Sequence, residues 1–383
     1  MEQCAQNQAA NHKAPMDALL RSLKRQGSHI EYHQLRPLPD TGLAHWHVRL
    51  PCLRNIDGSA RHIAAHRETH ACGRTSAQRD DWVARIPKQS QMQLDAEHNL
   101  AYQAACFARA QAGGHTPRLH GCLPCDDLLP RGALLVEAID GRSADLPNDL
   151  PAMTEALASL HRLPLPTASQ PLDCPLDPWQ DMQREIRHQA EYLHAAGLSP
   201  HSLQAIERAL RTLPERLEHS RDATRLISFD AHPGNFLIER TGRAVLVDLE
   251  KCRYSLPGFD LAHMSLYTST TWDINTRAIL FTEDIVALYQ RWQDRMGPDR
   301  HVQSWRDLIA CRQAMWLWSV TWCAKWKATQ QRMADSTHHG EDWSSQLSDD
   351  ALIQHVRNRV DHYLSLPILQ RVMRELRELA DAA

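Results

Sequence analysis

The segment from residue 228 to residue 250 contains four polar residues of special interest, which are Asp230, Asn235, Asp248 and Glu250. Asp230 and Asn235 follow one short β-like run, and Asp248 and Glu250 follow the next. A carboxylate directly after a strand can accept the proton of an attacking hydroxyl. An amide oxygen and a second carboxylate are ligands that Mg²⁺ prefers. A base beside metal ligands supplies the polar groups of phosphoryl transfer, so the segment predicts that chemistry.

Short strands must position these side chains. The runs 226–229 and 244–247 have the β-branched content and polar flanks of strands. Helical periodicity dominates the rest of the chain from Pro178 onward, so we expect this part to be mainly helical. Upstream, the apolar run 133–139 predicts a buried strand, which gives way to a flexible hinge over residues 138–146.

The first part of the chain shows β-like patterns. Runs at 30–35 and 44–50 flank a turn-rich segment that contains Gly42, and 82–86 has the pattern of a third strand. A helix over about 94–112 is predicted to follow. We therefore expect a strand, a glycine loop, two more strands and then a helix.

The composition narrows the class of protein. The chain has 383 residues, with 43 Lys plus Arg against 46 Asp plus Glu, and its net charge of −3 provides no electrostatic footprint for nucleic acid. It contains no apolar run of membrane-spanning length, and its first residues are polar, unlike a secretory signal. Ten scattered cysteines indicate reduced thiols. We expect a cytoplasmic protein without a membrane or nucleic-acid partner; its oligomeric state is not indicated.

The segment Ser228–Asn235, with the sequence SFDAHPGN, and the following DLE resemble motifs of the aminoglycoside phosphotransferase and choline kinase superfamily. That superfamily commonly shows HGDxHPGN and IDxE at these places. Its basic strand residue, helix glutamate and LLxExxxG hinge correspond in order to Arg85, Glu97 and the run LLVEAIDG. The run GFDLA, which contains Asp260, resembles its fDLA segment. The resemblance extends from about residue 36 to residue 270.

The resemblance implies an α+β, bilobal protein-kinase-like fold with a small antiparallel-sheet N-lobe of about five strands and a large, mainly helical C-lobe. It also implies a layout along the chain. Residues 1–28 would form an N-terminal segment, 29–140 the nucleotide-binding lobe with an insertion at 53–80, and 141–383 the helical lobe with the catalytic loop and metal strand.

The resemblance also assigns roles to residues of the helical lobe. Asp230 would be the catalytic base, and Asn235 and Asp248 would hold Mg²⁺. Glu250 is a candidate for a second metal, and Asp260 would support the loop. The expected reaction moves the γ-phosphate of ATP or GTP to a hydroxyl of a small molecule.

The nucleotide would be bound mainly by the N-lobe. Arg85 would contact the phosphates with Glu97 orienting it, and the loop at Gly42 would cover the phosphates. Backbone groups of Glu137 and Ile139 would bind the edge of the nucleobase.

Two departures from the superfamily pattern affect this interpretation. Ser228 stands where the superfamily has a histidine, so we expect the loop to be held differently. Lys88 is a second basic candidate, but Arg85 fits better because it lies inside the strand. A pseudokinase that binds nucleotide without transfer is the alternative, and the retained Asp230, Asn235 and Asp248 argue against it.

A tryptophan stripe in the helical lobe leaves two interpretations open. Trp318, Trp322 and Trp326 recur at helical spacing. Such stripes usually pack in a core. The alternative is a substrate wall of Trp318 and Trp322, which would favour a cationic amino alcohol or aminoglycoside through cation–π contacts.

Two further motifs are weaker signals. His62, His66 and His70 are spaced so that a helix would place them on one face as metal ligands, or as part of a polar surface helix. Cys122 and Cys125 form a single CxxC without a partner pair, which indicates ordinary buried thiols.

Overall fold

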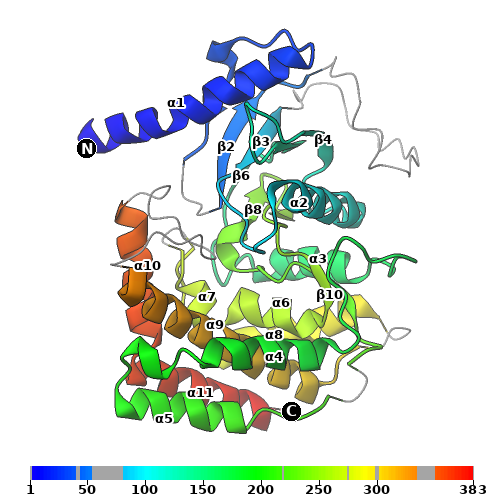
Figure 1. Ribbon diagram of the computed structural model, residues 1–383. Coiled ribbons are helices and arrows are strands. Elements are labelled where there is room, and N and C mark those ends of the chain that lie inside the picture. The colour runs from blue at the N-terminus through cyan, green and yellow to red at the C-terminus, as the bar shows by residue number, and fades with distance from the viewer. Residues whose placement is uncertain are drawn as a thin grey trace. The chain divides into compact units, whose positions relative to one another are not determined.

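The computed structural model describes most of the chain (Figure 1). The predicted loop at Gly42 and the histidines His62, His66 and His70 of the insertion lie outside the described residues. The described ranges are 2–39, 44–53, 81–217, 220–273, 276–297, 302–333 and 350–382.

The chain divides into two compact units. The first includes Met1–Gln111 and Pro117–Ile139. The second includes Ala112–Thr116, Asp140–His339 and Asp349–Ala383. The chain therefore passes from the first unit to the second within the predicted hinge segment.

The first unit contains an antiparallel five-stranded sheet, which confirms the predicted small sheet lobe. Its strand order is β1-β2-β3-β5-β4. The strands are β1 (Arg36–Pro37), β2 (His45–Leu50), β3 (Trp82–Pro87), β4 (Leu119–Leu123) and β5 (Ala133–Glu137).

The strand predicted over 30–35 is wrong. A short 3₁₀ helix, η1 (Tyr32–Gln34), forms there instead, and the strand is reduced to the two residues of β1. The Glu31 N–H donates to the Gln34 side-chain oxygen at 2.8 Å, and the Gln34 N–H donates to the Glu31 carbonyl at 3.0 Å. These local bonds satisfy the backbone in place of a sheet partner.

Helices cover the sheet of the first unit. Leu19 and Leu23 of α1 (Glu2–Arg25) belong to a buried cluster that also contains Ala84 and Ile86 of β3. Because successive strand residues point to opposite faces, Arg85 lies on the other face, and there its guanidinium meets Phe107 of α2 (Ala96–Ala110).

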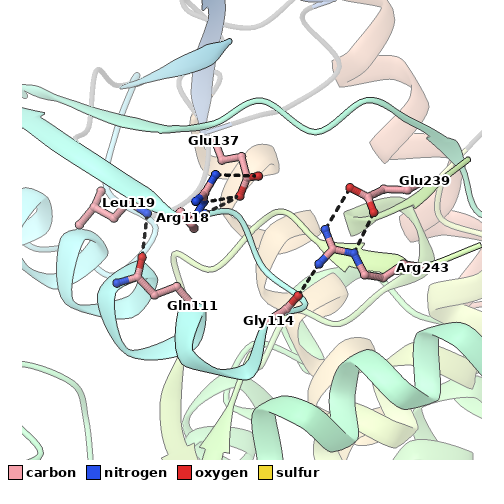
Figure 2. A network of polar contacts seen from close by, with 7 residues as sticks. All are labelled: Gln111, Gly114, Arg118, Leu119, Glu137, Glu239 and Arg243. Atoms are coloured by element: carbon pink, nitrogen blue, oxygen red, sulfur yellow. Dashed lines mark hydrogen bonds and ion pairs between the residues drawn. The ribbon is translucent and has the colours of Figure 1, made fainter. Parts of the chain in front are cut away.

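Polar contacts order the end of β5 and the residues around it. Arg118 binds the Glu137 carboxylate through its side chain, with Nε to Oε2 at 3.3 Å (Figure 2). The Gln111 side-chain oxygen accepts the N–H of Leu119 at 3.1 Å, which joins the short helix η3 (Gln111–Gly113) to β4. The last residues of the sheet are thus held by charged and amide groups.

The second unit is mainly helical, as predicted, with two small antiparallel sheets. One sheet has the order β6-β8-β9 and the other pairs β10 with β7. The strands are β6 (Gly141–Ser143), β7 (Arg225–Ile227), β8 (Phe236–Glu239), β9 (Ala244–Leu246) and β10 (Arg253–Ser255).

The helices of the second unit build its core. They are α3 (Leu150–His161), α4 (Pro178–Ala190), η4 (His194–Ala196), α5 (Pro200–Arg211), η5 (Pro233–Asn235), α6 (Pro257–Ser265), α7 (Tyr267–Thr270), α8 (Thr282–Met296), α9 (Trp305–Met333), α10 (Asp350–Tyr363) and α11 (Leu366–Asp381). The long helix α9 packs against α4 and α6 (Figure 1). None of the described helices is long and apolar enough to span a bilayer.

The β8–β9 turn is fixed by Arg243. Its guanidinium binds the Glu239 carboxylate at 2.8 and 3.0 Å, and it donates to the Gly114 carbonyl at 2.7 Å (Figure 2). The β8–β9 hairpin is therefore tied to the segment Ala112–Thr116.

A buried charge joins α9 to α6 and α11. Arg312 is fully buried, and it donates to the Glu375 carboxylate at 2.6 Å and to the Ser265 hydroxyl at 2.7 Å. A buried guanidinium is tolerated only where such partners replace water. Arg312 and Glu375 therefore fix the packing of these helices.

We predict that Glu375→Ala lowers the free energy of unfolding by about 3 to 5 kcal/mol, because it leaves a buried charge unpaired. Urea unfolding followed by circular dichroism measures the change. The matched control is Asp361→Ala, which removes the partner of Lys327 from a more exposed pair, and we expect a loss below about 1 kcal/mol. Equal losses in the two variants would contradict the prediction.

Candidate active site

The structure brings Asp230, Asn235 and Asp248 together. The loop that carries Asp230 and Asn235 follows β7, turns through η5 and enters β8. The Asn235 amide nitrogen donates to the Asp230 carbonyl at 2.8 Å. The Asn235 carbonyl accepts the N–H of Val247 at 2.9 Å, which places Asn235 beside the residue preceding Asp248.

The arrangement of Asn235 and Asp248 fits a magnesium ion. Because the Asn235 amide nitrogen is used within the loop, its side-chain oxygen is directed away from that bond. Asp248 is half-buried at the end of β9, and Glu250 is buried two residues later. The described residues contain no group of three His, Cys, Asp or Glu side chains arranged to hold a metal. Mg²⁺ does not need one, since it binds through one or two carboxylates together with waters and phosphates.

Asp230 lies among positive and titratable groups. Lys251 Nζ is 3.1 Å from Asp230 Oδ2, and His263 Nδ1 is 3.9 Å from Oδ1. Burial raises the pKa of Asp230, but the charges of Lys251, His232 and His263 outweigh it, so the pKa stays below its ordinary value. Asp230 is therefore ionised at neutral pH, as a proton acceptor must be.

His263 is a neutral imidazole beside this base. Burial lowers the pKa of His263 to about 4, although the Asp230 charge opposes the shift. Its ring centroid is 6.0 Å from that of His232. Sequence reasoning did not identify Lys251 or His263, although Lys251 directly follows the DLE run and His263 directly follows DLA.

Asp260 holds the backbone of the catalytic loop. Its carboxylate accepts the N–H groups of Ser228 and Phe229, each at 2.8 Å. His161 Nε2 donates to the same carboxylate at 3.1 Å, and the Trp292 indole N–H donates to His161 Nδ1 at 3.0 Å. Since Nδ1 is an acceptor here, the proton of His161 is on Nε2. Buried hydrogen bonds therefore run from Trp292 through His161 to Asp260, and from Asp260 to the backbone before Asp230.

The residues before Asp230 adopt an unusual conformation. Phe229 has φ of +59°, in the left-handed region, which costs a residue other than glycine about 1 to 2 kcal/mol. The superfamily motif HGDxHPGN has glycine at this place, so Phe229 is a further departure from the pattern. Ser228, which replaces the histidine, accepts the Asp230 N–H on its hydroxyl at 3.2 Å. The loop is therefore held by Ser228 and Asp260.

The side chain of Phe229 is clamped from two sides. The Arg253 guanidinium lies 3.7 Å from the centre of the ring, and Trp318 meets the ring edge-on at 5.4 Å. Glu185 joins the two clamping residues, because it accepts the Trp318 indole N–H at 2.8 Å and pairs with Arg253 at 3.4 Å. The clamp compensates for the backbone strain at Phe229.

The two predicted substrate tryptophans differ in their surroundings. Trp318 belongs to the clamp on Phe229. Trp322 is half-buried and meets Trp272 edge-on at 6.0 Å, outside the clamp. Trp326 is buried.

The predicted nucleotide residues lie in the first unit, on separate surfaces. Arg85 is buried, with its guanidinium 5.3 Å from the centre of the Phe107 ring. Lys88 lies 5.5 Å from the Trp46 ring, and Trp46 packs with the α1 side of the sheet. Glu97 is exposed in the first turn of α2.

Two backbone N–H groups at the end of β5 are engaged in hydrogen bonds within the first unit. The Glu137 N–H donates to the Arg118 carbonyl at 2.8 Å, so this N–H is engaged within the sheet. The Ala138 N–H donates to the Asp81 carbonyl at 3.0 Å. Ile139 follows directly, as the last residue of the segment Pro117–Ile139 of the first unit.

The cysteines of the described ranges are free thiols. Burial raises the pKa of Cys122 to about 11, so its thiolate is disfavoured at neutral pH. His120 stacks on Trp82, with ring centres 4.6 Å apart. The CxxC of Cys122 and Cys125 therefore lacks the character of a reactive or metal-binding pair.

An antiparallel-sheet unit and a helical unit with this loop define a protein of the protein-kinase-like fold. Similar solved structures are macrolide 2'-phosphotransferase MphH from Brachybacterium faecium (12% identity, TM-score 0.52, 92% of this chain and 98% of that chain) and choline kinase from Cryptosporidium parvum (12%, 0.52, 92% and 92%). Another is the GDP and kanamycin complex of APH(2")-IIia (15%, 0.53, 89% and 98%). At these identities the likeness shows the fold.

The family follows from the sequence. Residues 59–295 match the model of APH, the phosphotransferase enzyme family, and the chain belongs to this family. The comparison with curated proteins finds no matching sequence. The predicted resemblance and the kinase-like fold are thereby confirmed.

We predict that Phe229→Gly is more stable than Phe229→Ala by about 1 kcal/mol, reversing the usual order, because alanine keeps the Cβ that strains a left-handed residue. Both variants lose the ring from the clamp, so their difference isolates the backbone strain. Urea unfolding of the pair measures it. A more stable alanine variant would show that φ at this position is negative in solution.

Proposed function

We propose that the protein is a Mg²⁺-dependent phosphotransferase that moves the γ-phosphate of ATP or GTP to a hydroxyl of a small molecule. The observation that carries the proposal is a carboxylate, Asp230, held ionised beside the oxygen ligands Asn235 and Asp248. Membership of the phosphotransferase enzyme family supports it.

In this proposal Asp230 accepts the proton of the acceptor hydroxyl. Asn235 and Asp248 would hold Mg²⁺, which neutralises phosphate charge when bound, and Glu250 would serve a second ion. A scaffold without transfer activity would not need a base held ionised against its own burial, so the arrangement disfavours the pseudokinase alternative.

The nucleotide residues of the first unit complete the proposal. Arg85 would contact the phosphates, and Glu97 would orient it in the nucleotide-bound state. The Glu137 carbonyl and Ile139 would bind the nucleobase edge, since the Glu137 N–H is engaged with Arg118. The described residues favour neither ATP nor GTP, and one of the similar solved structures is a complex with GDP.

A cationic acceptor, such as an amino alcohol or an aminoglycoside, is the class that we propose. The Asp273 carboxylate lies against the catalytic loop, because a Cβ on Gly234 would be only 3.0 Å from Asp273 Oδ2. Trp272 directly precedes Asp273 in the chain, and Trp322 meets Trp272 edge-on, with ring centres 6.0 Å apart. A carboxylate with neighbouring aromatic faces attracts an ammonium group. Trp318 contributes to this wall less directly, because its indole N–H is bound to Glu185.

We predict that Asp230→Asn lowers the rate of phosphoryl transfer at least about 100-fold, because the general base is lost, while nucleotide affinity stays within a few-fold. The assay is release of ADP or GDP over a panel of amino alcohols, aminoglycosides, sugars and vitamins. Asp294→Asn, at an exposed position of α8, is the matched control and should retain full activity. Turnover of Asp230→Asn within threefold of the wild type would sink the assignment.

We predict that Trp322→Leu raises the KM for a cationic acceptor by about 2- to 30-fold, because leucine keeps apolar volume but removes the π face. The KM for the nucleotide should hold steady. Trp318→Leu should instead lower the melting temperature, because it opens the clamp on Phe229. If Trp322→Leu changes only stability, the tryptophan stripe is core, and the cationic class loses its support.

A further inference from the structure

Lys251 is fixed against the catalytic base by the geometry of two strands. β10 pairs with β7 so that Arg253 lies opposite Ile227. Continuing that antiparallel register by two residues sets Lys251 opposite Phe229, directly before Asp230. The turn that carries Lys251 is closed by the bond from the Cys252 N–H to the Leu249 carbonyl at 3.1 Å.

The ion pair between Lys251 and Asp230 is partly buried. Nζ lies 3.1 Å from Oδ2, and the side chains are 20% and 15% exposed. An ammonium ion weakens a carboxylate as a proton acceptor, so the pair does not serve basicity alone. We therefore looked to the surroundings of Asp230 for a second role of the Lys251 ammonium.

The position of the ammonium defines that role. A hydroxyl that gives its proton to Asp230 lies within about 2.6 to 3.2 Å of a carboxylate oxygen. The phosphorus it attacks is about 3 to 3.5 Å further. Lys251 Nζ is 3.1 Å from Asp230 Oδ2, so a hydroxyl bound to that carboxylate would bring its reacting phosphorus within reach of the ammonium.

We propose that Lys251 is a further catalytic residue, which contacts the transferring phosphoryl group and stabilises its charge in the transition state. This inference rests on the proposed function. In the step, the acceptor oxygen forms a bond to the γ-phosphorus, and the bond from that phosphorus to the bridging oxygen breaks. The electron pair leaves with the nucleoside diphosphate, the hydroxyl proton moves to Asp230, and Lys251 stays protonated.

A transition-state mimic tests this without a known acceptor. The probes are MgADP and MgGDP, each titrated with and without aluminium fluoride, which occupies the place of the transferring phosphoryl group. We expect Lys251→Met to weaken binding of the fluoride complex by about 10- to 100-fold, as one lost charge-assisted contact would. Affinity for the diphosphate without fluoride should stay within twofold. Lys251→Arg should recover most of the loss.

The matched control is Lys327→Met, which removes a lysine of similar exposure that also pairs with an aspartate in the same unit. It should leave both affinities unchanged. Melting temperatures confirm that each variant is folded, and Lys251→Gln replaces Lys251→Met if the latter unfolds.

Two results overturn the inference in different ways. If Lys251→Met binds the fluoride complex as tightly as the wild type does, or loses affinity for the diphosphate alone equally, Lys251 does not act on the transferring group. If the wild-type protein binds neither MgADP nor MgGDP, the proposed function fails, and the inference fails with it.

Discussion

The active loop depends on one buried carboxylate. Asp260 accepts two successive backbone N–H groups, which fixes the direction of both toward one side chain. One of these groups belongs to Phe229, whose φ of +59° the loop must maintain. His161 of α3 and Trp292 of α8 continue this hydrogen-bonded chain, so the position of Asp230 depends on the helical core. A loop on such a support is preorganised rather than assembled by substrate.

The second constraint is charge. Asp230 is buried enough that its ionised form needs compensation, and the charge of Lys251 is the largest contribution to it. His263 is kept neutral by the same burial, so it does not compete as a full cation. The negative charge of Asp248 acts in the opposite direction to that of Lys251, because it raises the pKa of Asp230. A metal ion on Asp248 would cancel that opposition, which couples metal binding to the state of the base.

The proximity of Asp230, Asn235 and Asp248 could be predicted from the sequence because the signals for it are local. Asp230 and Asn235 lie within one turn, and Asp248 follows on the paired strand, so spacing alone predicts their meeting. Lys251 lies in the turn before β10, and its contact with Asp230, which follows β7, depends on the pairing of these two strands, which no local pattern encodes. The strand predicted over 30–35 failed for the opposite reason, because a side-chain bond between Glu31 and Gln34 outweighed β propensity. Hydrophobic periodicity therefore does not predict which strands pair, or where a side chain replaces a strand partner as the acceptor of a backbone N–H.

Phe229 shows how a departure from the family pattern is accommodated. A glycine would adopt the left-handed backbone conformation without strain. Phenylalanine is strained in this conformation, but its ring can make packing contacts that a glycine cannot. Arg253 and Trp318 contact that ring, and Glu185 binds Arg253 through an ion pair and Trp318 through a hydrogen bond. Because Trp318 projects from the same helix as Trp322, the helix proposed to face the acceptor also supports the residue next to the base. Movement of α9 on binding of the proposed acceptor would therefore be transmitted through Trp318 and Phe229 to Asp230, the proposed base.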